Sequence, residues 1–129
     1  MTRPVLLLLL LAACDGWIAP QDAYQIMPPP EYAVWWQASR ACVNRPEYRT
    51  FAEVEWYLSP AALIDKDGSE HGAMSIDNRV YLWSSYYATA PWVIQHELVH
   101  AINMLGNDHP ADPFERCGLT SDTAVEEDQ

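Results

Sequence analysis

The sequence of 129 residues contains few basic residues, few glycines and few cysteines. Seven Lys and Arg residues stand against 18 Asp and Glu residues, which gives a formal net charge of −11. Nucleic acids and anionic lipid surfaces bind proteins through clustered basic side chains, so this balance argues against both as direct partners. The apolar run at residues 5–11 is too short to cross a bilayer as a permanent helix.

Residues 1–13 have the three regions of a secretory signal peptide: Arg3, the apolar run, and small residues before Cys14. Leu11-Ala12-Ala13-Cys14 resembles the bacterial lipobox. The resemblance implies lipidation of Cys14 and export to the bacterial cell envelope, with the protein anchored to a membrane on its periplasmic or extracellular face. Asp15 resembles a signal for retention in the inner membrane, but inner and outer membrane both stay open. The alternative is an ordinary signal peptide cleaved nearby.

Only three cysteines are present. With Cys14 assigned to the lipid, Cys42 and Cys117 form an even pair in an oxidising compartment, and we predict a disulfide between them. A bridge that closes so long a loop could stabilise a small domain by about 4 kcal/mol. Two separate buried thiols are the alternative.

Composition divides the rest of the chain into three parts. Residues 14–30 contain four prolines and no apolar period, which predicts an extended tether between membrane and domain. Residues 31–118 are expected to form one α+β domain. Its core is predicted to contain the five tryptophans Trp35, Trp36, Trp56, Trp83 and Trp92. Residues 119–129 are polar and acidic and are expected to be a disordered tail.

Hydrophobic periodicity predicts the main elements of this domain. Helical spacing predicts a helix over residues 31–43, and alternation predicts half-buried strands over 50–58 and 78–84, with a turn at 65–68 between them. A longer helix of about four turns is expected to begin at Thr89 as N-cap, with Pro91 in its first turn, and to stop at Gly106.

The longer helix contains His96-Glu97-Leu98-Val99-His100, the H-E-x-x-H spacing. Residues four apart on a helix lie one above the other, so His96 and His100 can offer two imidazole nitrogens to one ion, with Glu97 beside them. An apolar stripe covers a separate face of the helix, which can therefore pack on one side and present a metal site on another. The stripe consists of Ile94, Leu98, Ala101, Ile102 and Leu105.

The uncharged residues around this spacing resemble the extended motif of zincin metallopeptidases. His109-Pro110 and Cys117-Gly118 are also similar to the paired dipeptides of uncharacterised bacterial lipoproteins. The zincin resemblance implies a zinc cofactor, a peptide or protein substrate, and Glu97 as general base for water activated by the metal. It also implies that the strand before the helix borders the cleft, and we assign that role to residues 80–84.

A catalytic zinc needs a third protein ligand. The metzincin pattern Gly-x-x-His is present as Gly106 to His109, three positions later than in that family. Three extended residues after Gly106 can return about 10 Å, which brings His109 within reach of the metal. Oxygen ligands from Asp108, Asp112 or Glu115 stay open as rivals.

Other assignments remain open from the sequence. His71, expected in a loop, and the tyrosines Tyr81, Tyr86 and Tyr87 are candidates for stabilising an oxyanion. The main alternative function is a non-catalytic binding lipoprotein on a zincin-like scaffold. A zinc-scavenging protein is disfavoured because histidine-rich tracts are absent from the sequence.

Overall fold

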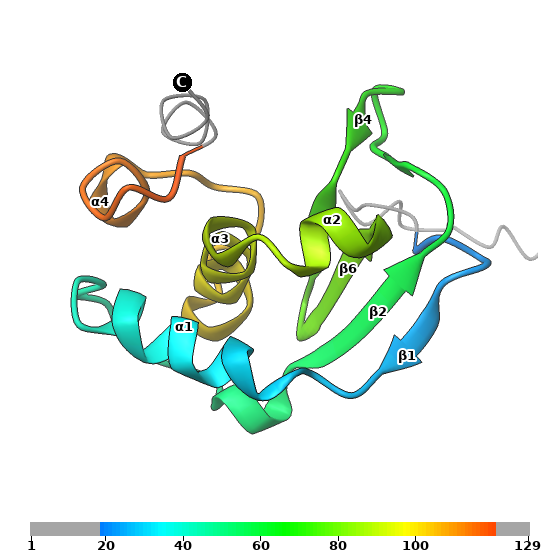
Figure 1. Cartoon of the computed structure of the whole chain (residues 1–129). Coiled ribbons are helices and arrows are strands. Elements are labelled where there is room, and N and C mark those ends of the chain that lie inside the picture. The colour runs from blue at the N-terminus through cyan, green and yellow to red at the C-terminus, as the bar shows by residue number, and fades with distance from the viewer. Residues whose placement is uncertain (1–18, 121–129) are drawn as a thin grey trace, which may run out of the picture.

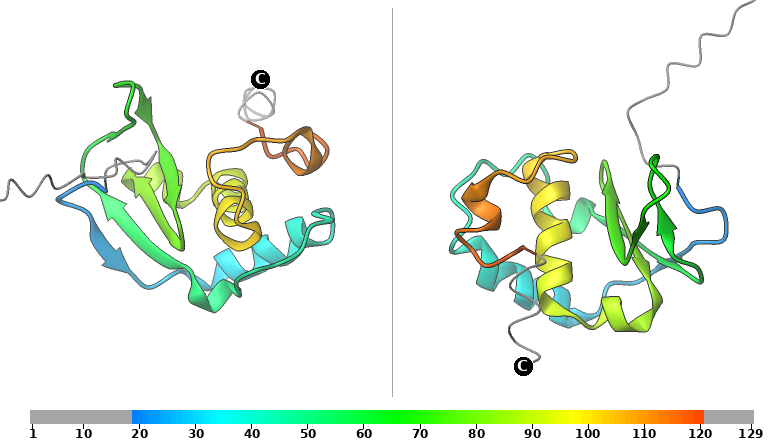
Figure 2. Two further views of the ribbon diagram at one scale, coloured as in Figure 1. Left: turned by 180° about the vertical axis from the view of Figure 1, so that it is seen from behind. Right: turned by 90° about the horizontal axis from the view of Figure 1, so that it is seen from above.

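The computed structural model describes residues 19–120. The predicted signal peptide, Cys14 and residues 121–129 lie outside this range. The described chain is a small α+β domain in which helix α3 lies between a mixed β-sheet on one side and helix α4 on the other (Figures 1 and 2). Within residues 19–120, no helix combines the length and the apolar composition that crossing a membrane requires.

Four short strands build the main sheet. They are β1 (Tyr24–Ile26), β2 (Glu55–Ser59), β5 (Ala73–Ile76) and β6 (Arg79–Trp83). Their order is β1-β2-β6-β5, with β2 and β6 parallel and the two outer pairs antiparallel. Strands β3 (Leu63–Ile64) and β4 (Glu70–His71) form a separate antiparallel pair. Strand β5 is therefore an edge of the main sheet, and β6 lies inside it.

The first strand corrects the predicted tether. Residues 14–30 were expected to be extended and separate from the domain, but Tyr24–Ile26 pairs with β2, with Tyr24 opposite Leu58 and Ile26 opposite Trp56. A three-residue strand is too short to show an alternating pattern, and β2 supplies the ladder that holds it. Strands β3, β4 and β5 were not predicted either, because they too are short, with two to four residues each.

The predicted elements lie close to their observed positions, with shifted ends. Helix α1 is Pro30–Arg40, which stops before the predicted end at residue 43. The predicted strand over residues 50–58 begins as a 3-10 turn, Phe51–Glu53, before β2. The residue after β6 opens helix α2 (Ser84–Ala88), and helix α4 is Ala111–Phe114.

Helix α3 (Pro91–Asn103) has Pro91 in its first turn, as predicted, but both predicted end signals are wrong. The N-cap is Ala90, with no side-chain hydrogen bond, instead of Thr89. The helix ends at Met104, which adopts a left-handed conformation with φ 53° and donates its N–H to the His100 carbonyl. The chain therefore reverses two residues before Gly106, which brings the following loop back over the helix.

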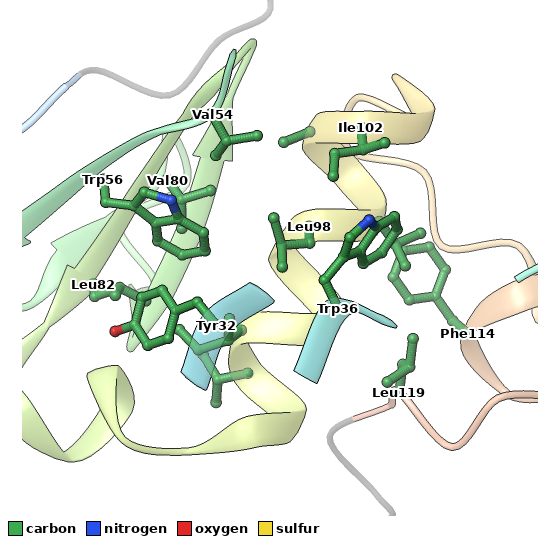
Figure 3. Close-up of a cluster of buried hydrophobic side chains, with 14 residues drawn as sticks. Tyr32, Trp36, Val54, Trp56, Val80, Leu82, Leu98, Ile102, Phe114 and Leu119 are labelled. Carbon is green, nitrogen blue, oxygen red and sulfur yellow. The ribbon is translucent and has the colours of Figure 1, made fainter. Parts of the chain in front are cut away.

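The core lies between the sheet, α1 and α3 (Figure 3). The stripe residues Ile94, Leu98, Ala101 and Ile102 are fully buried, as the helical pattern predicts. The fifth predicted member, Leu105, lies beyond the end of α3 and is half-buried. Trp36 and Trp56 are buried as well, whereas the other three domain tryptophans are half-buried. Phe114 and Leu119, from the segment after α3, complete this core on the side away from the sheet. Leu119 was expected to begin the disordered tail, but its burial makes it part of the domain.

Gly72 lies between β4 and β5, close to the ring of Tyr87. A Cβ atom at Gly72 would stand 2.2 Å from Cε1 of Tyr87, and that ring is itself stacked against Trp83. We expect Gly72→Ala to lower the free energy of unfolding by about 1–3 kcal/mol, the usual cost of overpacking. Chemical denaturation measures this loss. Ser69→Ala, an exposed change on the same hairpin, is the control, and equal stability of the two variants would contradict the close approach.

Candidate metal centre

Helix α3 places His96 and His100 one turn apart on the same face. Their Nε2 atoms are 3.2 Å apart. His100 is buried and His96 half-buried, while the apolar stripe fixes the opposite side of the helix in the core. The positions of both imidazoles are therefore set by the packing of α3.

His109 joins this pair from the loop that follows Met104. Its Nε2 atom lies 3.2 Å from Nε2 of His96 and 3.0 Å from Nε2 of His100. A tetrahedral zinc ion with zinc–nitrogen distances of about 2.0–2.1 Å separates its nitrogen ligands by about 3.3 Å. The triangle of three nitrogens thus has nearly the edge length that such an ion requires, and these three histidines could bind a metal ion.

The chemistry of the three nitrogens also favours a cation. Three Nε2 atoms that face one another cannot all be satisfied by protons, because each proton serves only one contact. The surroundings also favour the neutral imidazoles that coordinate metals. Burial lowers the pKa of His100 to about 3, helped by the neighbouring His96 and His109. Burial likewise lowers the pKa of His96 and of His109, and His96 adds to the effect on His109.

His96 is oriented by a backbone group from the end of the described chain. Its Nδ1–H donates to the Leu119 carbonyl oxygen at 2.5 Å, which leaves the Nε2 lone pair directed at the other two histidines. The ring of Phe114 lies against all three imidazoles, with centroid distances of 4.7, 4.8 and 4.9 Å to His96, His100 and His109.

The rival oxygen ligands have different surroundings. The side chain of Asp112 accepts two hydrogen bonds from Arg116. Glu115 lines the same cleft as the three histidines. Within the described residues, the group whose ligand atoms lie within 4.8 Å of one another consists of the three histidines, without Asp108, Asp112 or Glu115.

Glu97 occupies a buried position beside the triangle and is only 5% exposed. The Ser75 hydroxyl, on β5, lies 2.7 Å from Oε2 of Glu97 and 3.1 Å from the Glu97 backbone carbonyl. Burial raises the pKa of Glu97 to about 7, although the bond from Ser75 and the nearby His109 and His71 act in the opposite direction. A carboxyl group with a pKa near neutrality can both accept and return a proton.

The hydrogen bond from Ser75 is expected to lower the pKa of Glu97. A hydroxyl that donates to a carboxylate stabilises the charged form, so Ser75→Ala should raise the pKa of Glu97 further above its ordinary value. A hydrogen bond to a charged group contributes about 1.5–3 kcal/mol, which corresponds to a rise of about one unit or more. Carboxyl-carbon NMR of the metal-free protein measures it, with Ser85→Ala as control. A fall in the pKa would contradict the bond.

One cleft of about 840 Å³ opens over these groups. Its walls come from α3, β5, the β3–β4 pair and the loop that carries His109. The lining includes Ser75, His96, Glu97, His100 and His109. The assignment of residues 80–84 to the border of the cleft is wrong. These residues fall mainly in β6, which pairs with β2 on one side and with β5 on the other, so neither edge is free. The strand that borders the cleft is β5.

The candidates for oxyanion stabilisation differ in whether they line the cleft. His71 lies on β4 instead of a loop, and its Nε2 is 2.7 Å from Oδ2 of Asp65; both residues line the cleft. Tyr87 also lines the cleft. Tyr81 is buried against Leu63 and Met74 and does not line it. The side chain of Tyr86 lies outside the described part of the structure.

Ser75, Phe114 and Leu119 are the site residues that the sequence did not indicate. None of them belongs to a motif. Ser75 reaches Glu97 because β5 packs against α3, and Phe114 and Leu119 reach the histidines from the segment after α3. Comparison of the chain with protein-family models, curated proteins and solved structures gives no significant match. Function is therefore inferred from these residues and their geometry.

Proposed function

We propose that this protein is a zinc-dependent metallopeptidase. The observation that carries the proposal is that three histidine nitrogens and one buried carboxyl group face the same cleft: His96, His100 and His109 form the triangle, and Glu97 lies beside it. Three protein ligands with a further coordination position free for water or substrate are the usual composition of a catalytic zinc site.

Zinc is the metal that we propose for this triangle. Three neutral imidazoles suit zinc. The nitrogen–nitrogen distances of 3.0–3.2 Å are close to the separation of about 3.3 Å between nitrogen ligands of tetrahedral zinc. When bound, zinc supplies a Lewis acid that polarises a carbonyl group and acidifies water. The protein supplies the ligand geometry, with His96 held by Leu119 and with His100 buried.

Glu97 is the proposed general base. Its carboxyl group lies in the cleft, and its pKa of about 7 lets the carboxylate take a proton from water and pass it to the departing amine. The Ser75 hydroxyl fixes the orientation of the carboxylate and acts to lower the pKa of Glu97 against the effect of burial. The burial that raises the pKa of Glu97 also strengthens its interactions with the reacting atoms.

An extended peptide is the proposed substrate. Within residues 19–120, strand β5 is the outer strand of the main sheet, lines the cleft and carries Ser75 next to Glu97. A peptide added beside it as a further strand would run past the three histidines. The cleft volume of about 840 Å³ falls within the range of ligand pockets, about 300–1,000 Å³.

We also propose that the protein acts in the bacterial cell envelope, attached to a membrane through lipid on Cys14. The Cys42–Cys117 disulfide supports an oxidising compartment, which is the condition for such bonds to persist.

The test is metal-dependent cleavage of an unbiased mixture of peptides, with new termini identified by mass spectrometry. We expect cleavage by protein carrying one zinc per chain, none by protein stripped with a chelator, and recovery when one equivalent of zinc is returned. Stoichiometric zinc without any cleavage would reject the peptidase and favour the alternative, a binding lipoprotein. Protein that takes up no zinc would reject the metal centre as well.

A further inference from the structure

We propose that the segment from Ala111 to Leu119, fastened to the end of α1 by the Cys42–Cys117 disulfide, is a latch that sets the metal affinity of the three histidines. We call this segment the C-terminal latch. The proposal rests on the metal-binding part of the proposed function and does not depend on peptide hydrolysis. Its members are positioning residues, since they act through the histidines.

The latch contacts the histidines through two of its residues. The Leu119 carbonyl accepts the hydrogen bond from Nδ1 of His96, and the Phe114 ring lies against all three imidazoles. Both side chains are almost completely buried, with Phe114 0% and Leu119 2% exposed. The latch therefore forms one side of the metal centre.

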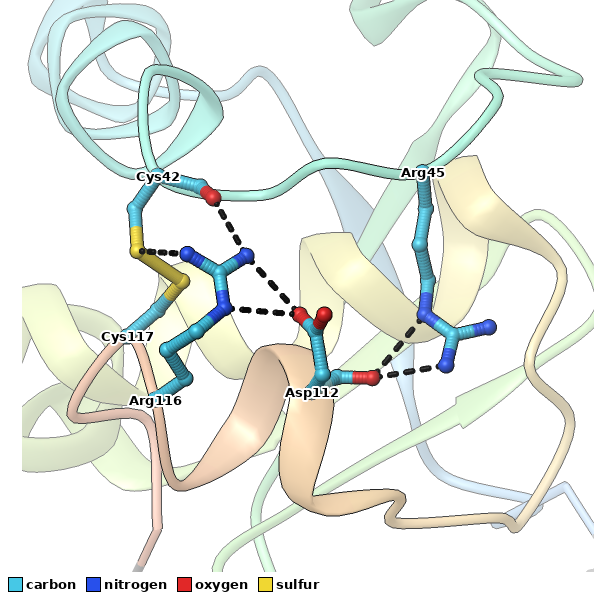
Figure 4. Close-up of polar contacts among 5 residues, drawn as sticks. All are labelled: Cys42, Arg45, Asp112, Arg116 and Cys117. Carbon is cyan, nitrogen blue, oxygen red and sulfur yellow. Dashed lines mark hydrogen bonds and ion pairs between the residues drawn. A yellow bond between two sulfur atoms is a disulfide. The ribbon is translucent and has the colours of Figure 1, made fainter.

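The latch is held mainly by bonds to the chain around the end of α1 (Figure 4). Cys117 is bonded to Cys42, and Nη2 of Arg116 donates to the Cys42 carbonyl at 2.8 Å. Arg45 donates to the Asp112 carbonyl from Nε at 3.0 Å and from Nη2 at 2.7 Å. Helix α4 has only four residues, so its own backbone hydrogen bonds contribute little to holding the latch in place.

The anchor of the latch is tied to the helix that carries two of the ligands. Helix α1 packs against α3, and the Gln95 side chain of α3 donates to the Trp35 carbonyl of α1 at 2.8 Å. The disulfide thus connects the latch to the same packed pair of helices that positions His96 and His100. His109 lies between α3 and the latch, so its loop is fixed at both ends.

Loss of the disulfide would release one end of this arrangement. The Leu119 carbonyl would no longer be held against His96, and His109 would have to be ordered each time a metal binds. Groups that orient a metal ligand typically change metal affinity by about 10–100-fold. The ion pair between Arg116 and Asp112 cannot replace the bridge, because both residues belong to the latch and the pair does not connect it to α1.

The experiment compares zinc affinity in wild type and in the double variant Cys42→Ser/Cys117→Ser, by competition with a chromophoric chelator. Serine removes the bridge without leaving thiols at positions 42 and 117 that could bind zinc. We expect affinity to fall by about 10–100-fold and the His96 Nδ1–H proton resonance to lose its hydrogen-bonded shift. Phe51→Leu is the matched control: it removes a ring that packs near Trp56, outside both the latch and the cleft, and should bind zinc as wild type does.

A second variant keeps the proposal testable if the double variant does not fold. Phe114→Leu retains the disulfide and an apolar side chain but removes the ring from the three imidazoles, and it should weaken zinc binding several-fold. Unchanged affinity in a folded double variant, or in Phe114→Leu if only that one folds, would overturn the latch. No zinc binding by wild type would instead overturn the metal centre itself, so the two failures are distinguishable.

Discussion

Replacement of His100 by Ala will abolish stoichiometric zinc binding by the domain. His100 is the most enclosed of the three ligands, and its Nε2 is 3.2 Å from that of His96 and 3.0 Å from that of His109. Without it, two histidines on different segments remain, and affinity should fall by more than about 100-fold, the upper end of losses that follow from removing an orienting group alone. Elemental analysis of the purified domain and titration with zinc measure this loss.

His109→Ala should weaken zinc binding less than His100→Ala does. His96 and His100 lie on one helix whose opposite face is buried, so both stay in position when the loop ligand is removed. His71→Ala is the control, because His71 lines the same cleft without joining the triangle, and it should keep about one zinc per chain. Stoichiometric zinc in His100→Ala, or its loss in His71→Ala, would show that the ligands are assigned wrongly.

Glu97→Gln will retain zinc and lose hydrolysis. Glutamine has nearly the shape of glutamate and can still accept the Ser75 hydrogen bond, but it cannot take a proton from water. General-base catalysis contributes about 10²- to 10⁴-fold, so kcat should fall by that factor while the zinc content stays near one per chain. The measurement pairs steady-state kinetics on a cleaved peptide with elemental analysis of the same sample.

Glu31→Gln provides the matched control for Glu97→Gln. Glu31 is exposed in the first turn of α1 and does not line the cleft, and the change removes the same charge without touching Glu97, so activity should be close to that of wild type. If Glu97→Gln were as active as Glu31→Gln, Glu97 would not be the base, and the proposed mechanism would be wrong even with zinc in place.

Local patterns were sufficient where one element carries all the information. The spacing of His96 and His100 places both on one face of α3 because helical geometry alone brings residues four apart together. The apolar stripe of α3 and the strand β2 were also visible, since each repeats over enough residues to show a period. The strands that the sequence missed have between two and four residues.

Helix ends were less predictable. Gly106 has the residue type that usually ends a helix, yet Met104 takes the left-handed position. A non-glycine residue carries a steric penalty there, and packing of the surrounding chain has to offset it. Sequence preferences do not include that contribution, so the turn that returns the chain toward His109 could not be located from them.

The sequence by itself determined the candidate metal-binding pair of histidines, the glutamate next to His96, the helix that carries all three and the candidate cysteine pair. Tertiary structure decided which of four candidates joins His96 and His100, which strand borders the cleft, and which groups orient the site. The physical reason is the distance along the sequence between the residues that have to meet. Helical neighbours are set by backbone geometry over a single turn, whereas His109, Ser75 on β5 and the Leu119 carbonyl reach the site only after separate segments pack against α3.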